Sequence, residues 1–112
     1  MSSYPLVDPQ MVQMLKQIGA FGEIIEVLTA SAKQRLSAIQ QGLAAHDRKQ
    51  IKFEAHGFKS ASLQSGALRL GKLCHALEES AESATWPKIE DQLSMIEAAW
   101  TLTSDALCKF RD

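Results

Sequence analysis

The sequence predicts an all-α protein, an antiparallel up-and-down four-helix bundle with an additional short N-terminal helix. Three observations support this fold class. Apolar residues recur every three or four positions along most of the chain, as they do on one face of a helix. No proline occurs between Pro9 and Pro87, so helices can run without interruption. The chain contains no Asn and no Asp-Gly pair, and the usual signals of β-hairpins are therefore missing.

The first half of the chain predicts two helices of unequal length. A short leading helix begins at Asp8-Pro9 and carries Met11, Leu15 and Ile18. After the break at Gly19 and Gly22, a long helix is expected over about 20–45. Its apolar stripe consists of Phe21, Ile25, Leu28, Ala32, Leu36, Ile39 and Leu43.

The second half predicts three more helices. Asp47 can cap a third helix with the stripe Ile51, Ala55, Phe58 and Ser62. After a break around Ser65-Gly66, a fourth helix runs to about Ser83 with the stripe Ala67, Leu70, Cys74, Leu77 and Ala81. Thr85 caps the last helix, Pro87 lies in its first turn, and its stripe is Ile89, Leu93, Ile96, Trp100, Thr103, Leu107 and Phe110. The short links predict antiparallel neighbours.

The length of 112 residues fits a single domain spanning 1–112. No apolar run is long enough to cross a membrane, and the first residues do not resemble a signal peptide. Cys74 and Cys108 are far apart in the sequence, and their spacing matches neither a metal-binding motif nor a disulfide framework. We interpret them as buried structural cysteines. We therefore expect a reduced, cytoplasmic monomer without a metal site. The sequence also lacks a Gly-rich phosphate loop and the common hydrolase motifs, so no kinase or other nucleotide-using enzyme is expected.

Charge is distributed unevenly along the chain. Residues 48–72 contain six basic residues and one acidic residue, whereas residues 73–112 contain three basic and eight acidic residues. Such a basic segment can steer the protein towards a negatively charged partner, or it can be an ordinary solvated face. A helical nucleic-acid binder is disfavoured, because the net charge is −1 and no continuous basic helix is present.

His56 is the histidine whose exposure can be predicted from the helical pattern. If the stripe from Ile51 to Ser62 faces the core, His56 projects roughly 130° away from the stripe centre, at ~100° per residue. Lys52 and Lys59 lie on the same side, at i−4 and i+3. An exposed histidine flanked by lysines is often an ordinary surface residue, and this interpretation remains open at this point.

Two neighbours of His56 favour a functional interpretation. Gly57 lies in a helix interior, where glycine is ~1 kcal/mol less favourable than alanine unless something approaches closely. Phe53 faces away from the core stripe, on the side of the histidine. Departures from local sequence rules concentrate at functional sites, so we expect one around His56.

The run HGFKSASLQSGA at 56–67, followed by Leu70, Cys74, Leu77 and Glu78, resembles the histidine-containing phosphotransfer (HPt) domains of two-component phosphorelays. The opening VDPQMVQMLKQIG and the approach SAIQQGLAAHD are similar as well, so the resemblance covers essentially the whole chain. One position departs from the commonest pattern, since Ser60 stands where many members have Gly. A small residue still leaves room for a partner there.

The resemblance implies that His56 is the phosphoacceptor, through Nε2, and that Lys59 stabilises the phosphoryl charge. We expect the partner to dock on a surface made of Phe53, Gly57, Ser60, Lys52 and Leu63, where the small Gly57 and Ser60 keep the surface low, and Gly66 is a structural residue of the motif. The implied partners are the receiver domains of a hybrid sensor histidine kinase and of response regulators, and Mg²⁺ is expected on the receiver. The alternative is a helical interaction module that has lost phosphotransfer.

Overall fold

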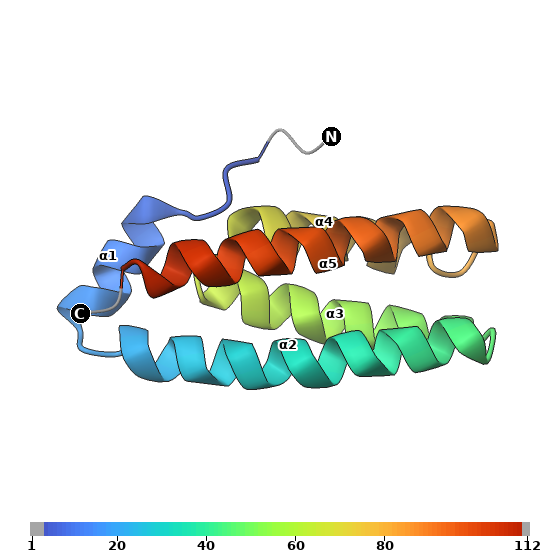
Figure 1. Cartoon of the computed structure of the whole chain (residues 1–112), viewed down its shortest axis with the longest axis horizontal. Helices are drawn as coiled ribbons and strands as arrows, with labels where there is room; N and C mark the ends of the chain where they lie inside the picture. Colours follow the sequence, from blue (N-terminus) through green and yellow to red (C-terminus); the bar gives the residue numbers. More distant parts are fainter. Residues whose placement is uncertain (1–3, 111–112) are drawn as a thin grey trace.

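The computed structural model of the protein describes residues 4–110 and contains five α-helices in that part of the chain (Figure 1). Their bounds are α1 Pro9–Gln17, α2 Phe21–Ala44, α3 Arg48–Gln64, α4 Leu68–Ser80 and α5 Trp86–Cys108. No strand occurs in these residues. The predicted all-α class, with one short helix before four bundle helices, is confirmed.

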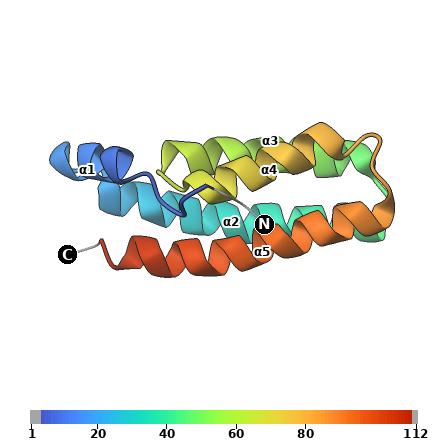
Figure 2. The same cartoon turned by 90° about the horizontal axis from the view of Figure 1, so that it is seen from above.

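The four long helices form an elongated bundle, and the molecule measures 42 × 25 × 18 Å along its principal axes. Helix α3 packs against α2 and α4, and α5 closes the bundle against α4 and α2. The short α1 lies at the end of the bundle where α2 begins and α5 ends, as both views show (Figures 1 and 2). In the described part of the chain, no helix is long and apolar enough to cross a membrane.

Side-chain caps begin three of the helices. Asp8 accepts hydrogen bonds from the first amides of α1, Asp47 accepts one from Gln50 in α3, and Thr85 accepts one from Lys88 in α5. The sequence predicts Asp47 and Thr85 as caps and the start of the first helix at Asp8-Pro9, and the structure confirms all three. Helix α4 ends at Ser80, three residues earlier than predicted, because the chain turns there and the Ser80 carbonyl accepts hydrogen bonds from Ser83 and Ala84.

Gly66 holds the turn between α3 and α4 in a conformation that favours glycine. Its φ is +79°, and a Cβ at this position would lie 3.3 Å from the side chain of Val12 in α1. Its carbonyl accepts a hydrogen bond of 2.8 Å from the amide of Asp8, the cap of α1. Gly66 therefore joins the α3–α4 turn to the start of α1.

The core is formed by the predicted stripes, which contribute the buried residues Phe21, Ile25, Leu28, Ala32, Ile39, Ile51, Ala55, Phe58, Leu70, Cys74, Leu77, Ile89, Leu93, Ile96 and Leu107. Three predictions of burial are wrong, all at helix ends. Ile18 is 68% exposed because it follows the last residue of α1 and leaves the helical spacing. Phe110 is 37% exposed in the turn after α5. Cys108 is exposed because it lies beside the buried Leu107, about 100° further around α5.

Candidate functional site

Helix α3 has the rotation about its axis that the sequence predicts. Ile51, Ala55 and Phe58 are fully buried, whereas Phe53 is 68% exposed and the His56 side chain is 59% exposed. Phe53 and His56 therefore form an outward-facing ridge on α3. The bundle positions His56 through the buried face of the same helix and leaves its ring open to another molecule.

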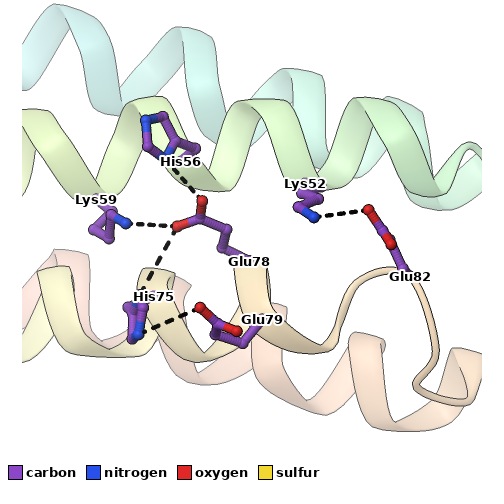
Figure 3. Close-up of polar contacts among 7 residues, drawn as sticks. All are labelled: Lys52, His56, Lys59, His75, Glu78, Glu79 and Glu82. Atoms are coloured by element: carbon purple, nitrogen blue, oxygen red, sulfur yellow. Dashed lines mark hydrogen bonds and ion pairs between the residues drawn. The ribbon is translucent and has the colours of Figure 1, made fainter.

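Glu78 of α4 contacts the imidazole of His56 across the α3–α4 packing (Figure 3). Its Oε2 lies 2.7 Å from Nδ1 of His56, and its Oε1 lies 2.7 Å from Nζ of Lys59. The Glu78 and Lys59 side chains are only 15% and 20% exposed, so both groups are held below the ridge. One carboxylate thus connects the histidine with the nearest lysine.

The electrostatics of Glu78 determine which nitrogen of His56 is free. The ammonium group of Lys59 holds the pKa of the Glu78 carboxyl below its usual range, and the contact with His56 lowers it further, against the opposing effect of burial. Glu78 is therefore ionised at neutral pH, and a carboxylate can only accept hydrogen bonds. A neutral His56 ring that meets this carboxylate therefore donates from Nδ1, and its lone pair is then on Nε2.

More distant charges surround this trio. His75 of α4 lies 3.8 Å from Oε1 of Glu78 through Nδ1, and 3.7 Å from Glu79 through Nε2. Lys52 forms an ion pair of 2.7 Å with Glu82, beyond the end of α4. The hydrogen bond from Lys52 to Glu82 raises the pKa of this lysine. Within residues 4–110, no group of three or more His, Cys, Asp or Glu side chains is arranged to hold a metal ion.

The basic segment 48–72 is largely matched by partners within the molecule. Lys52 and Lys59 pair with glutamates that follow in the acidic segment, and Arg48 donates to the carbonyls of Ala81 and Ala84 where α4 ends. Arg69 and Lys72 both contact Tyr4. Several basic side chains of this segment therefore link α3 to α4 and to the turn after α4. The segment does not form a uniformly free basic patch.

Gly57 does not leave the open surface that the sequence suggests. The guanidinium group of Arg35, from α2, fills the space beside it, and a Cβ at position 57 would lie 2.6 Å from Nη2 of Arg35. The close approach that explains this glycine is therefore made by a side chain of the protein itself. The expectation that Gly57 leaves bare backbone for a partner is wrong, because Arg35 covers that side of α3.

Arg35 is held in this position by further contacts. Its Nη1 donates a hydrogen bond of 2.8 Å to Oε1 of Glu54, one turn before Gly57 on α3. Its Cζ lies 5.9 Å from the centre of the Phe53 ring. The Arg35 side chain remains 32% exposed. A cation therefore lies on the α2 side of the ridge, as Lys59 does on the α4 side.

Ser60 and Leu63 complete the predicted docking residues. Ser60 is half-buried, one turn after His56. Leu63 is half-buried as well, and it packs into the space beside Gly71 of α4, where a Cβ would lie 2.7 Å from Cγ of Leu63. Leu63 is thus mainly a residue of the α3–α4 packing, and the exposed ridge lies around Phe53, His56 and Ser60.

Sequence reasoning missed two residues of this site. Glu78 entered only as part of a family pattern and received no role, although an acidic residue one turn after the predicted core residue Cys74 could have drawn attention. Arg35 gave no signal of its own. The unusual Gly57 was the sign that a group approaches α3 at this point.

The comparisons with known proteins agree with this fold. The model of the Hpt domain family matches residues 23–102, so the chain belongs to the Hpt domain family. This family carries out histidine phosphotransfer in two-component signalling, and its members act as phosphoryl carriers rather than as kinases.

A solved structure has the same fold. The crystal structure of histidine-containing phosphotransfer protein B (HptB) from Pseudomonas aeruginosa PAO1 is similar to this chain with a TM-score of 0.87 and 22% sequence identity. The match covers 96% of this chain and 95% of that chain. No curated protein sequence matches the chain.

Proposed function

We propose that this protein is a phosphorelay intermediate in which Nε2 of His56 accepts a phosphoryl group from a receiver-domain aspartate and passes it to a response regulator. The observation that carries the proposal is the 2.7 Å contact between Nδ1 of His56 and the carboxylate of Glu78. This contact supports a hydrogen on Nδ1, which would leave the nucleophilic lone pair of the exposed ring on Nε2.

The proposed step transfers one phosphoryl group without any other reactant. The Nε2 lone pair of His56 attacks phosphorus, the bond between phosphorus and the aspartyl oxygen breaks, and its electron pair stays on the receiver carboxylate. Nδ1 keeps its hydrogen, and the positive charge that grows on the ring is offset by Glu78. Transfer to the response regulator reverses these bond changes.

Lys59 has two roles in this proposal. Phosphoryl transfer depends mainly on positioning and on neutralising charge at the phosphoryl oxygens. The ammonium group of Lys59, held 2.7 Å from Glu78, lies on the same side of α3 as His56 and can turn towards an incoming phosphoryl group. Until then it keeps Glu78 ionised.

The shape of the exposed ridge on α3 indicates what kind of partner can dock there. Phe53 and His56 protrude from α3 with Ser60 one turn away, which suits a partner that brings its acidic pocket directly over the imidazole. In this proposal the receiver carries the phosphoryl group and its Mg²⁺. The upstream receiver belongs to a hybrid sensor kinase, and the downstream receiver to a response regulator.

The test is phosphoryl acceptance by His56→Gln. We expect the variant to take no label from a receiver phosphorylated with ³²P-acetyl phosphate, while its helical content and melting temperature match the wild type because His56 is exposed. His75→Gln and His46→Gln serve as matched controls and should still become labelled. Label that is acid-labile and alkali-stable identifies phosphohistidine. Labelling of His56→Gln would show that another residue is the acceptor.

The alternative function is a helical interaction module that binds receivers without accepting phosphate. The His56–Glu78–Lys59 arrangement favours the carrier, since a module used only for binding gains nothing from directing a ring nitrogen outwards. Wild-type protein that binds phosphorylated receivers but never becomes labelled by any of them would support the alternative instead.

A further inference from the structure

We propose that Arg35 of α2 is a second recognition residue of the docking surface, which binds a carboxylate on the rim of the receiver, and that Gly57 permits this by making room for the guanidinium group. The proposal rests on the function proposed above and concerns partner docking, not the chemistry at Nε2. Its central observation is that the guanidinium group of Arg35 reaches from α2 to the ridge of α3, beside Gly57 and Glu54.

The contacts of the guanidinium group fix its position but leave some of its N–H donors available. A guanidinium has five N–H donors in one plane, and within residues 4–110 the structure shows a hydrogen bond only from Nη1, to Glu54. With its side chain 32% exposed, Arg35 keeps other donors at the surface. A planar group held in one orientation suits a carboxylate, which it can bind through two parallel hydrogen bonds.

The surroundings define the chemistry of the partner. The Phe53 ring, 68% exposed, lies beside the guanidinium at 5.9 Å from Cζ. On the far side of the ridge, Lys59 and Lys52 are already paired with Glu78 and Glu82. The free donors of Arg35 thus add a positively charged contact next to an apolar one. This combination fits an acidic receiver surface that presents a carboxylate beside an apolar side chain.

Gly57 is the residue that makes this placement possible. Any Cβ at position 57 would overlap the guanidinium, so an alanine there must displace the end of the Arg35 side chain. That side chain is flexible, and alanine is the better helix former, so Gly57→Ala should fold and be at least as stable as the wild type. The substitution therefore moves Arg35 without removing it.

The experiment is a double-mutant cycle on phosphoryl transfer from a phosphorylated receiver. We expect Arg35→Ala to lower the second-order transfer rate constant about tenfold, the effect of losing one charge-assisted contact from an interface. Gly57→Ala should lower it several-fold. In the Arg35→Ala background, Gly57→Ala should have no further effect. Lys33→Ala, which removes a charge from an exposed position on the same helix, is the matched control and should change the rate less than twofold.

A second donor separates docking from chemistry. Phosphoramidate is a small molecule that transfers its phosphoryl group to histidine and releases ammonia without a docking surface, so wild type, Arg35→Ala and Gly57→Ala should all react at the same rate with it. The proposal is overturned if Arg35→Ala transfers normally from the receiver, or if it slows both donors equally. It is also overturned if Gly57→Ala slows transfer equally with and without Arg35, because the partner would then touch position 57 directly. Failure of the wild type itself to accept phosphate from any receiver would instead refute the proposed function.

Discussion

On each side of helix α3 a cation is held by a carboxylate, but the two carboxylates contact different groups. On the α4 side, Glu78 contacts both Lys59 and the imidazole of His56. On the α2 side, Glu54 contacts Arg35 and, among the described residues, no imidazole. A carboxylate shared between a cation and the ring can control reactivity, whereas one that holds only the cation can control recognition. The comparison predicts different defects when each side is changed.

The largest effect is expected from Glu78→Gln. We expect transfer from a phosphorylated receiver to fall at least about 100-fold, because the neutral amide loses the charge that stabilises the ring and can turn an N–H towards Nδ1. Rapid-quench kinetics measures the rate, and ¹⁵N chemical shifts report which nitrogen of His56 carries the hydrogen. Glu79→Gln is the matched control, since Glu79 lies next to Glu78 in the sequence and pairs with His75. A normal transfer rate in Glu78→Gln would show that the carboxylate on the α4 side of α3 does not control reactivity.

Phe53→Asp tests the ridge that both sides share. We expect receiver affinity to drop by about ten- to a hundredfold, the effect of removing one buried aromatic from an interface. The melting temperature should barely change, because Phe53 is 68% exposed in the free protein. Titration calorimetry measures affinity and thermal denaturation checks the fold. Normal affinity with a large loss of stability would show that Phe53 serves the bundle and not the partner.

Lys59→Ala is expected to have a smaller effect on transfer. Loss of the ammonium group should slow the reaction several-fold, because the phosphoryl oxygens lose one cation while Glu78 still holds His56. The free energy of unfolding should change by about 1 kcal/mol or less, as for most partly exposed ion pairs. Lys88→Ala, which removes an exposed charge from α5, is the control. Unchanged quench-flow rates would reduce Lys59 to a structural partner of Glu78.

The smallest expected effect is on the pH dependence of stability. Because Lys59 and His56 hold the pKa of Glu78 below its unfolded value of about 4.3, Glu78 contributes stability above that pH. The contribution is lost as the pH falls through the lower folded-state pKa. The difference in unfolding free energy between wild type and Glu78→Gln should therefore shrink from pH 7 to pH 3 in denaturant titrations. A difference that is constant over this range would contradict the assignment.

The sequence predicted what depends on a single helix and missed what depends on how two helices pack. The burial of Ile51, Ala55 and Phe58 follows from spacing alone, and it placed Phe53 and His56 correctly on the exposed face. Whether Glu78 reaches His56 depends on the register between α3 and α4, which the periodicity of neither helix contains. The same holds for Arg35 and Gly57 across α2 and α3.

Helix ends were predicted less well for a local reason. Periodicity continues as a pattern beyond the last hydrogen-bonded turn, so Ile18 and Phe110 looked like core residues although they lie outside α1 and α5. The caps Asp8, Asp47 and Thr85 were predictable because each acts on amides two or three residues away.

The helical hairpin of α3 and α4 contains the whole His56–Lys59–Glu78 trio, and the histidine and the glutamate are 22 positions apart. A contact across so few residues costs less loop-closure entropy than a contact between distant parts of a chain. The reactive geometry is therefore assembled over a short stretch of chain. A domain fused outside this hairpin would therefore leave the distance between the ring and its carboxylate to be set by the packing of α3 against α4, provided that α2 and α5 still cover the hairpin.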